Sequence, residues 1–146
     1  MLPTRINRQG KEEIFDRLRK SWVRLTPEER VRQYFVDYLI NIAGYPMGRI
    51  GNEVSIELNG TVKRCDSVVY DVSGMPLAII EYKAPDVKIT RATFEQIMRY
   101  AIALRTPWLI VSNGLNHFCA FVEQGEPPRL KFLEKFPGYD ELCERQ

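Results

Sequence analysis

The stretch CDSVVYDVSGMPLAIIEYKAP, residues 65–85, predicts two β-strands joined by a tight turn around Ser73. Side chains alternate between the two faces of a strand, so Glu81 and Lys83 lie together on one face, beyond two apolar residues. Asp66 and Glu81 are about equally far from the turn, and a hairpin would therefore place them opposite each other. The stretch predicts a charged cluster at the open end of a β-hairpin.

Two helices are expected before this hairpin. Residues 10–22, GKEEIFDRLRKSW, carry apolar side chains at helical spacing, which predicts a short amphipathic helix. Residues 26–46 predict a longer helix with Thr26 as its N-cap and Pro27 at its first position, and Gly44 ends it. The apolar face of this longer helix consists of Val31, Tyr34, Phe35, Tyr38, Leu39 and Ile42.

The apolar period then changes from that of a helix to that of a strand. Asn59 and Gly60 form a typical two-residue hairpin turn, and residues 89–105 predict another amphipathic helix. Strands are expected at residues 49–58, 61–72, 75–84, 106–113 and 115–123. A hairpin followed by a crossover helix and a buried apolar strand predicts the α/β class, with a mixed sheet flanked by helices.

The composition is that of one ordinary globular domain. The chain has 146 residues, of which 45% are hydrophobic and 27% charged, and its net charge of +2 does not by itself indicate a polyanionic partner. No apolar run approaches the ~20 residues that cross a bilayer, and the N-terminus lacks a signal-peptide pattern. Cys65, Cys119 and Cys143 lack CxxC spacing, which predicts reduced thiols, and we expect a cytoplasmic protein with no membrane partner.

Histidine chemistry is limited because His117 is the single histidine, which excludes paired-histidine catalysis and histidine-rich metal sites. Its position between Asn116 and Phe118 on a strand favours a structural role. Cys119 is two residues away, but this spacing on a strand does not make a nucleophilic dyad. The chemistry of the chain therefore depends on its carboxylates and lysines.

The predicted cluster of Asp66, Glu81 and Lys83 suits phosphodiester hydrolysis. Two carboxylates that face each other on a sheet repel unless a cation joins them, and Mg²⁺ takes one or two protein carboxylates together with water and phosphate oxygens. Such a metal would polarise the phosphate, while the lysine would position water or stabilise the developing charge. An ion-pair network that only stabilises the fold is the alternative interpretation of the same three residues.

Five blocks in the same order resemble the N-terminal nuclease domain of type I restriction enzyme R (HsdR-like) subunits, a member of the PD-(D/E)xK nuclease superfamily. The blocks are TPEERVRQYFVDYLINIAGYP, KRCDSVVYD, IIEYKAP, TFEQIMRY and LIVSNG, and they cover roughly residues 26–121. The resemblance implies a restriction-endonuclease-like mixed sheet in residues 26–124. The helix expected at residues 10–22 makes residues 1–25 an N-terminal helical extension, and the segment rich in proline and charge forms a C-terminal tail in residues 125–146, which wraps the surface or ends in a short helix.

The resemblance also implies roles for the residues of the hairpin. Asp66 and Glu81 would bind Mg²⁺, for which Mn²⁺ could substitute, and the backbone carbonyl of Tyr82 would be a third ligand. Lys83 would be the catalytic lysine. Arg64, on the strand of Asp66, is expected to contact nucleic acid.

Residues outside the hairpin complete the expected site. Glu29, or with less support Glu28, would match the acidic residue that the first helix of these nucleases directs at the metal site. Gln96 and Tyr100 fit the Gln-x-x-x-Tyr motif of the helix after the ExK strand; they are one helical turn apart and could face the DNA backbone or the lysine. Glu53 is a weaker candidate for the acidic cluster.

The chain departs from this pattern in two ways. Cys65 stands where the superfamily name has proline, and no ATP-driven translocase or Gly-x-x-x-x-Gly-Lys-Ser/Thr loop is present. We therefore expect a metal-dependent restriction endonuclease that acts alone, as an excised domain, or as a subunit with DNA and modification, specificity or translocase subunits as partners. A dimer is plausible for cutting both strands. The rival hypothesis is a non-catalytic nuclease-like module that binds DNA or a protein.

Overall fold

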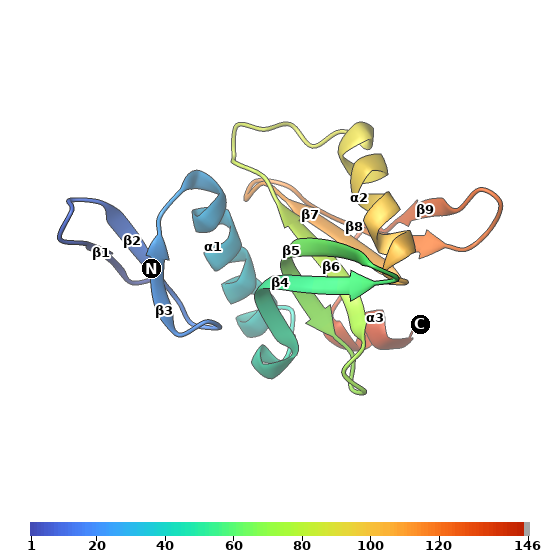
Figure 1. The fold of residues 1–146 in the computed structure, drawn as a ribbon, viewed down its shortest axis with the longest axis horizontal. Coiled ribbons are helices and arrows are strands. Elements are labelled where there is room, and N and C mark those ends of the chain that lie inside the picture. Colours follow the sequence, from blue (N-terminus) through green and yellow to red (C-terminus); the bar gives the residue numbers. More distant parts are fainter. Residues whose placement is uncertain (145–146) are drawn as a thin grey trace.

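The computed structural model describes residues 1–144, apart from the side chains of residues 58 and 61. In this part of the chain the main sheet has the order β4-β5-β6-β7-β8-β9, and all neighbouring strands are antiparallel except the parallel pair β6 and β7 (Figure 1). The strands are β4 (Ile50–Leu58), β5 (Thr61–Tyr70), β6 (Pro76–Tyr82), β7 (Trp108–Ser112), β8 (His117–Glu123) and β9 (Arg129–Phe132). The predicted mixed sheet is confirmed.

Helices cover both faces of this sheet (Figure 1). Helix α1 (Pro27–Asn41) and the short α3 (Tyr139–Glu144) pack on one face, where Phe35 is buried against β-strand side chains. Helix α2 (Arg91–Ala103) packs on the other face through a cluster that includes Ile97. The predicted α/β class, with a sheet between layers of helices, is therefore confirmed.

The hairpin β5–β6 forms in the expected register. Ser67 lies opposite Ile80, and continuing the register by one residue brings Asp66 opposite Glu81. The connecting turn includes Gly74 at φ +85°, a left-handed conformation that glycine adopts without a steric cost. From β6 the chain crosses over through α2 and returns parallel to β6 as β7, a strand that is buried along its whole length.

The helix predicted for residues 10–22 is wrong, because residues 1–25 contain strands instead. Strands β1 (Thr4–Ile6), β2 (Glu12–Asp16) and β3 (Ser21–Arg24) form a separate antiparallel sheet beside α1 (Figure 1). The N-terminal extension predicted for residues 1–25 is thus present but is not helical.

The local sequence explains this hairpin. Phe15 lies opposite Trp22, and their ring centroids are 5.3 Å apart in an edge-on arrangement. Asp16 accepts hydrogen bonds from the backbone N–H groups of Leu18 and Arg19, at 2.8 and 2.9 Å, which stabilises a turn. A spacing of seven residues between two aromatic side chains is compatible with one face of a helix and also with two opposite positions of a hairpin. The spacing alone therefore could not distinguish the predicted helix from the observed hairpin.

The expected C-terminal tail contains two elements. The short helix considered for this segment is α3, whereas β9 extends the main sheet and was not predicted. A four-residue strand between prolines and charged residues has too little alternation to be recognised from sequence. Within residues 1–144, no helix is both long enough and apolar enough to span a bilayer.

Candidate functional site

The charged residues at the end of β6 come together as predicted. The Nζ atom of Lys83 is 3.9 Å from Oε1 of Glu81, and Oδ2 of Asp66 accepts a hydrogen bond of 3.0 Å from the backbone N–H of Tyr82. The backbone N–H of Lys83 donates to the carbonyl of Ser112 on β7 at 2.9 Å. The Asp66 carboxylate is therefore bonded to the segment that carries Glu81 and Lys83, and a main-chain bond holds Lys83 to β7.

The electrostatic setting of Glu81 disfavours its negative charge. Burial is the largest cause that raises the pKa of Glu81 above its ordinary value, and the charge of Asp66 raises it further. Nearby positive charges on Lys83 and Lys63 oppose this shift without cancelling it. The nearby positive charge is thus too small to offset the burial of Glu81 and its repulsion by Asp66, and an additional cation would favour the charged form of Glu81.

Replacing Glu81 with Gln should make stability less dependent on pH. The folded pKa of Glu81 is raised above 4.5, so the folded chain holds its proton to higher pH than the unfolded chain does, and the free energy of unfolding falls as the pH rises through that window. Metal-free Glu81→Gln should therefore need more urea to unfold than wild type at neutral pH, and this advantage should vanish below the ordinary carboxyl pKa. Urea denaturation across this range, with the exposed Glu57→Gln as control, measures the effect. Parallel curves for wild type and Glu81→Gln would contradict it.

A hollow of about 60 Å³ on the α2 face contains the predicted helix residues. Gln96 and Tyr100 line it together with Glu81 and Lys83, so the structure brings both motif residues to the lysine. The Nζ atom of Lys63 lies 4.2 Å from the ring centroid of Tyr100, a cation–π contact. Lys63 was not singled out from the sequence, yet it adds a second cation to this hollow.

A second hollow, of about 130 Å³, lies between the start of α1 and the hairpin. It is lined by Thr26, Glu28, Glu29, Arg32, Glu53, Asp66 and Tyr82. Asp66 therefore lines this hollow, whereas Glu81 and Lys83 line the other, and the end of β6 separates the two. The predicted triad is close in space but is divided between two openings.

The two candidate acids of α1 have different surroundings. Glu29 is buried, its backbone N–H donates to the N-cap oxygen of Thr26 at 3.0 Å, and its carboxylate accepts from Arg32 and Gln33. Burial acts to raise the pKa of Glu29, but these hydrogen bonds and nearby arginine charges lower it overall. Glu28 is exposed, and its charge contributes to the raised pKa of Glu81. Of these two acids, Glu28 contributes to the pKa of Glu81, as the smallest of its causes, and the role predicted for Glu29 stays a prediction.

Glu53 lies beside the site in an unusual conformation. Its φ of +53° is in the left-handed region, which is costly for a residue other than glycine. Its carboxylate forms ion pairs with Arg32 at 3.0 Å and Arg64 at 2.8 Å. The side chain of Arg64 is 70% exposed, so it is accessible to a ligand while it neutralises Glu53.

Arg32 is the principal residue that the sequence analysis missed. Its buried guanidinium binds both carboxylate oxygens of Glu29, pairs with Glu53 and donates to the main-chain carbonyl of Asp66 at 2.9 Å. Burial acts to lower the pKa of Arg32, but the bonds and charge of Glu29 raise it overall. A signal existed: this arginine follows Glu29 by three residues and precedes Phe35 by three, which places it near the apolar face of α1.

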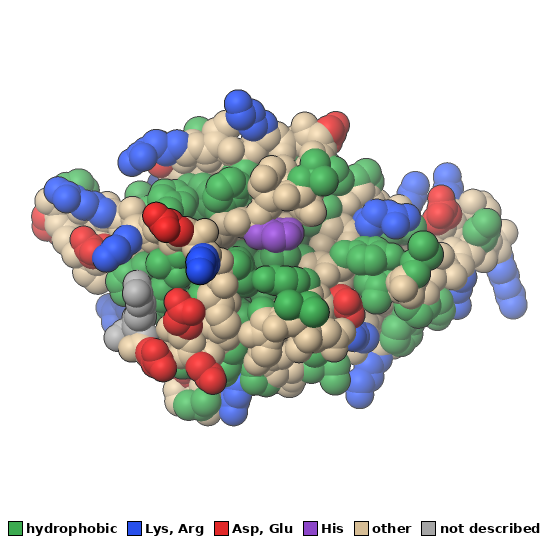
Figure 2. Space-filling model, turned by 180° about the vertical axis from the view of Figure 1, so that it is seen from behind, with side chains coloured by type: hydrophobic (Ala, Val, Ile, Leu, Met, Phe, Trp, Pro, Cys, Tyr) green, Lys and Arg blue, Asp and Glu red, His purple; other side chains and the backbone are tan. Residues whose placement is uncertain are grey.

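His117 and the cysteines do not form a catalytic site. The Nδ1 atom of His117 is 2.6 Å from Oγ of Ser112, and its ring lies 4.9 Å from that of Phe35. Figure 2 shows the single histidine surrounded by hydrophobic side chains on the face opposite to that of Figure 1. Burial raises the pKa of Cys65 to about 11 and that of Cys119 to about 12, which keeps both thiols protonated at neutral pH.

The donor set fits Mg²⁺ better than a closed metal site. Among residues 1–144, no three or more His, Cys, Asp or Glu side chains are arranged to hold a metal ion. Asp66 supplies a carboxylate to one hollow and Glu81 to the other, and the main chain of Tyr82 runs between the two hollows. Mg²⁺ takes one or two carboxylates and fills its remaining positions with water and phosphate oxygens, whereas structural zinc requires four protein ligands.

Comparisons with known proteins agree with this architecture. The family described as "Type I restriction enzyme R protein N terminus" matches residues 27–137. A solved fragment assigned as an HsdR subunit of a type I restriction enzyme from Vibrio vulnificus YJ016 has 21% identity and a TM-score of 0.62. The match covers 83% of this chain and 25% of that chain, so this chain spans about a quarter of the similar structure. The search of curated proteins gave no match.

Proposed function

The chain belongs to the family of type I restriction enzyme R protein N termini, and from this premise we propose that it is a divalent-metal-dependent DNA endonuclease domain of a restriction system. The observation that carries the proposal is the pairing of Asp66 with Glu81 beside Lys83, together with the raised pKa of Glu81. A partly buried pair of carboxylates with an adjacent lysine is the arrangement that a phosphodiester-hydrolysing metal site needs.

Each residue has a role in this proposal. Asp66, Glu81 and the main-chain carbonyl of Tyr82 would hold Mg²⁺, or Mn²⁺ in its place. The metal would supply Lewis-acid polarisation of a phosphoryl oxygen. Lys83 would donate hydrogen bonds to the oxygens on which negative charge develops. Gln96 would orient the DNA backbone or this lysine from α2.

The remaining residues and partners follow from the same proposal. Tyr100 and Arg64 would contact the phosphates of DNA, and Glu28 or Glu29 would adjust the charge of the site. The domain would act in the cytoplasm with modification, specificity or translocase subunits, and two copies would cut the two strands of a duplex. A non-catalytic module that binds DNA or protein is the competing function, although the presence of all three residue types in the triad argues against it.

Metal binding tests the proposal directly. Wild type should bind Mg²⁺ or Mn²⁺ in titration calorimetry and nick supercoiled plasmid in the presence of the metal, and both properties should be lost in Asp66→Ala and Glu81→Ala. Glu57→Ala, which removes an exposed carboxylate of β4, should retain both. If wild type binds no metal at millimolar concentration, even with DNA present, the endonuclease proposal is wrong and the domain serves as a binding module.

A further inference from the structure

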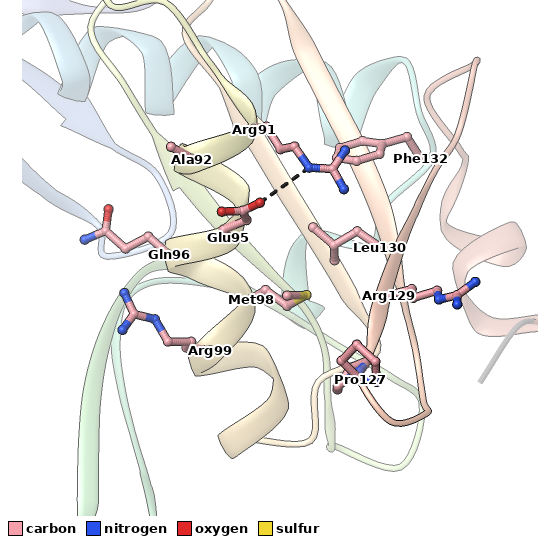
Figure 3. Close-up of a pocket in the computed structure, with 11 residues that line it drawn as sticks. Arg91, Ala92, Glu95, Gln96, Met98, Arg99, Pro127, Arg129, Leu130 and Phe132 are labelled. Atoms are coloured by element: carbon pink, nitrogen blue, oxygen red, sulfur yellow. Dashed lines mark ion pairs between the residues drawn. The ribbon is translucent and has the colours of Figure 1, made fainter.

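A groove between α2 and β9 lies outside the hollows that hold the predicted triad. Its volume is about 900 Å³, and it lies on the side of α2 away from Lys83. Figure 3 shows Arg91 of α2 reaching toward Phe132 of β9, with Glu95 joined to it by an ion pair and Met98 directed to the β9 side of the helix. We refer to it as the α2–β9 groove.

The rim of this groove is positively charged. Arg91, Arg99 and Arg129 border it, while Glu95 is its single acidic lining residue. Glu95 lies 3.4 Å from Arg91, but both side chains are highly exposed, so water screens this pair strongly. Arg91 and Arg99 are eight residues apart on one helix, which separates them by about 12 Å along its axis. Figure 3 shows Arg91 reaching from α2 toward Phe132, whereas Arg99 extends from the far side of α2 and Arg129 from the far side of β9, so the cations lie inside the groove and at its two outer edges.

One aromatic ring, that of Phe132, lines the groove, and a second exposed ring lies on the neighbouring strand. Phe132 is 42% exposed, and Phe118 on the neighbouring strand is 39% exposed. Both rings pack edge-on against the buried Phe94, with centroids 4.8 and 6.1 Å away. This packing holds the two rings in place while leaving part of each accessible. A nucleobase could stack on Phe132 with little loss of side-chain freedom.

We infer that the α2–β9 groove binds single-stranded nucleic acid. The arginines would pair with its phosphates and Phe132 would stack an unpaired base, which is the combination found in single-strand binding sites. A duplex fits less well, because the faces of its bases are stacked on each other and cannot reach a phenylalanine ring. An acidic peptide would match the charge but not the exposed aromatic ring.

The inference rests on the proposed endonuclease function and specifies which form of DNA would be its preferred substrate. Gln96 lines both the α2–β9 groove and the hollow of Glu81 and Lys83, so one residue of α2 borders both openings. A single strand held in the groove would lead directly to the predicted site of hydrolysis. The preferred substrate would then be DNA with an unpaired segment beside the cut, not an uninterrupted duplex.

Fluorescence anisotropy tests the inference with the full chain in EDTA, where hydrolysis cannot occur. A labelled oligothymidylate should bind more tightly than a duplex of equal length, and Phe132→Leu should weaken single-strand binding about tenfold. Arg99→Ala and Arg129→Ala should each weaken it and reduce the slope of log K against log salt concentration by about 0.7. Arg8→Ala removes an exposed arginine near the β1–β2 hairpin, at the other end of the molecule, and should leave binding unchanged (Figure 1).

Several outcomes would overturn the inference. One is tighter binding of a duplex than of a single strand, and another is equal affinity of the groove variants and wild type for the oligothymidylate. A third is competition by polyglutamate that is as effective as competition by single-stranded DNA, which would indicate a protein partner. Thermal melting of each variant shows whether lost binding reflects lost folding. The endonuclease proposal fails separately: Asp66→Ala should still bind oligothymidylate in EDTA, and an absence of metal binding in wild type leaves that measurement unaffected.

Discussion

Lys83→Met should nick supercoiled DNA at least about 100-fold more slowly than wild type while still binding Mg²⁺. The ammonium group is 3.9 Å from Glu81, one-third exposed and directed into the hollow that Gln96 and Tyr100 share. It is therefore placed to reach a phosphate without being needed as a metal ligand. Methionine keeps most of the side-chain volume and removes only the charge and the donors. Single-turnover nicking at saturating metal, with calorimetry in parallel, measures both properties.

Two other lysine substitutions show whether the effect is specific to Lys83. Lys135→Met removes an exposed lysine from the C-terminal segment and should leave nicking unchanged. Lys63→Met removes the cation that rests on Tyr100, and we expect a smaller loss because its ammonium is held by the ring. If Lys83→Met nicks as fast as wild type, this lysine only balances charge, and the assignment of the active site to the β6 end is wrong.

The hairpin of the candidate site could be predicted because its determinants are local. The turn around Ser73 and Gly74 and the alternation along β6 lie within twenty-one residues, and together they set the register that places Asp66 opposite Glu81. The same argument covers the spacing of Gln96 and Tyr100 on α2. Local sequence patterns were therefore sufficient to predict residues on both sides of the hollow that contains Lys83.

The N-terminal sheet could not be predicted in the same way, because a distant residue stabilises it. Asp16 is fully buried and accepts a hydrogen bond of 2.9 Å from Asn52, which is 36 residues away on β4. Burial acts to raise the pKa of Asp16, but hydrogen bonds from the Arg19 backbone, Asn52 and the Arg19 side chain lower it to about 2. Sequence periodicity carries no information about such a partner. The tertiary contact favours the hairpin over the helix that residues 10–22 could also form.

The sequence could not show whether Glu28 or Glu29 faces the site, because the contact that distinguishes the two residues also depends on the folded structure. Both residues suit the first turn of α1, where a carboxylate is stabilised by the helix dipole. What distinguishes them is Arg32, whose fork-shaped guanidinium binds both oxygens of Glu29 and leaves Glu28 exposed. Arg32 therefore determines the surroundings of both glutamates, and its substitution is expected to have a large effect.

Arg32→Met should destabilise the protein by about 3–5 kcal/mol, a large part of the free energy of unfolding of a domain of this size. The substitution removes a buried cation and leaves the carboxylate of Glu29 with only Arg19 at 3.2 Å and Gln33 at 2.9 Å. It also removes the hydrogen bond to the carbonyl of Asp66, so the metal ligand itself should become less well fixed. Urea denaturation at neutral pH measures the loss. Arg30→Met, two residues earlier and exposed on α1, is the matched control and should stay within about 0.5 kcal/mol of wild type.

A second substitution separates the cost of an unpaired buried charge from the loss of packing. If the uncompensated carboxylate of Glu29 causes the instability, Arg32→Met combined with Glu29→Leu should be more stable than Arg32→Met alone, because replacing both members of a buried ion pair with apolar residues is far less damaging than removing one. Glu53 keeps Arg64 as a partner at 2.8 Å in both variants, so it adds little to this difference. Equal stability of the single and double variants would mean that Arg32 acts mainly by packing and by its bond to Asp66. In that case calorimetry should show weaker Mg²⁺ binding in both variants, because the strand that carries Asp66 has lost its anchor to α1.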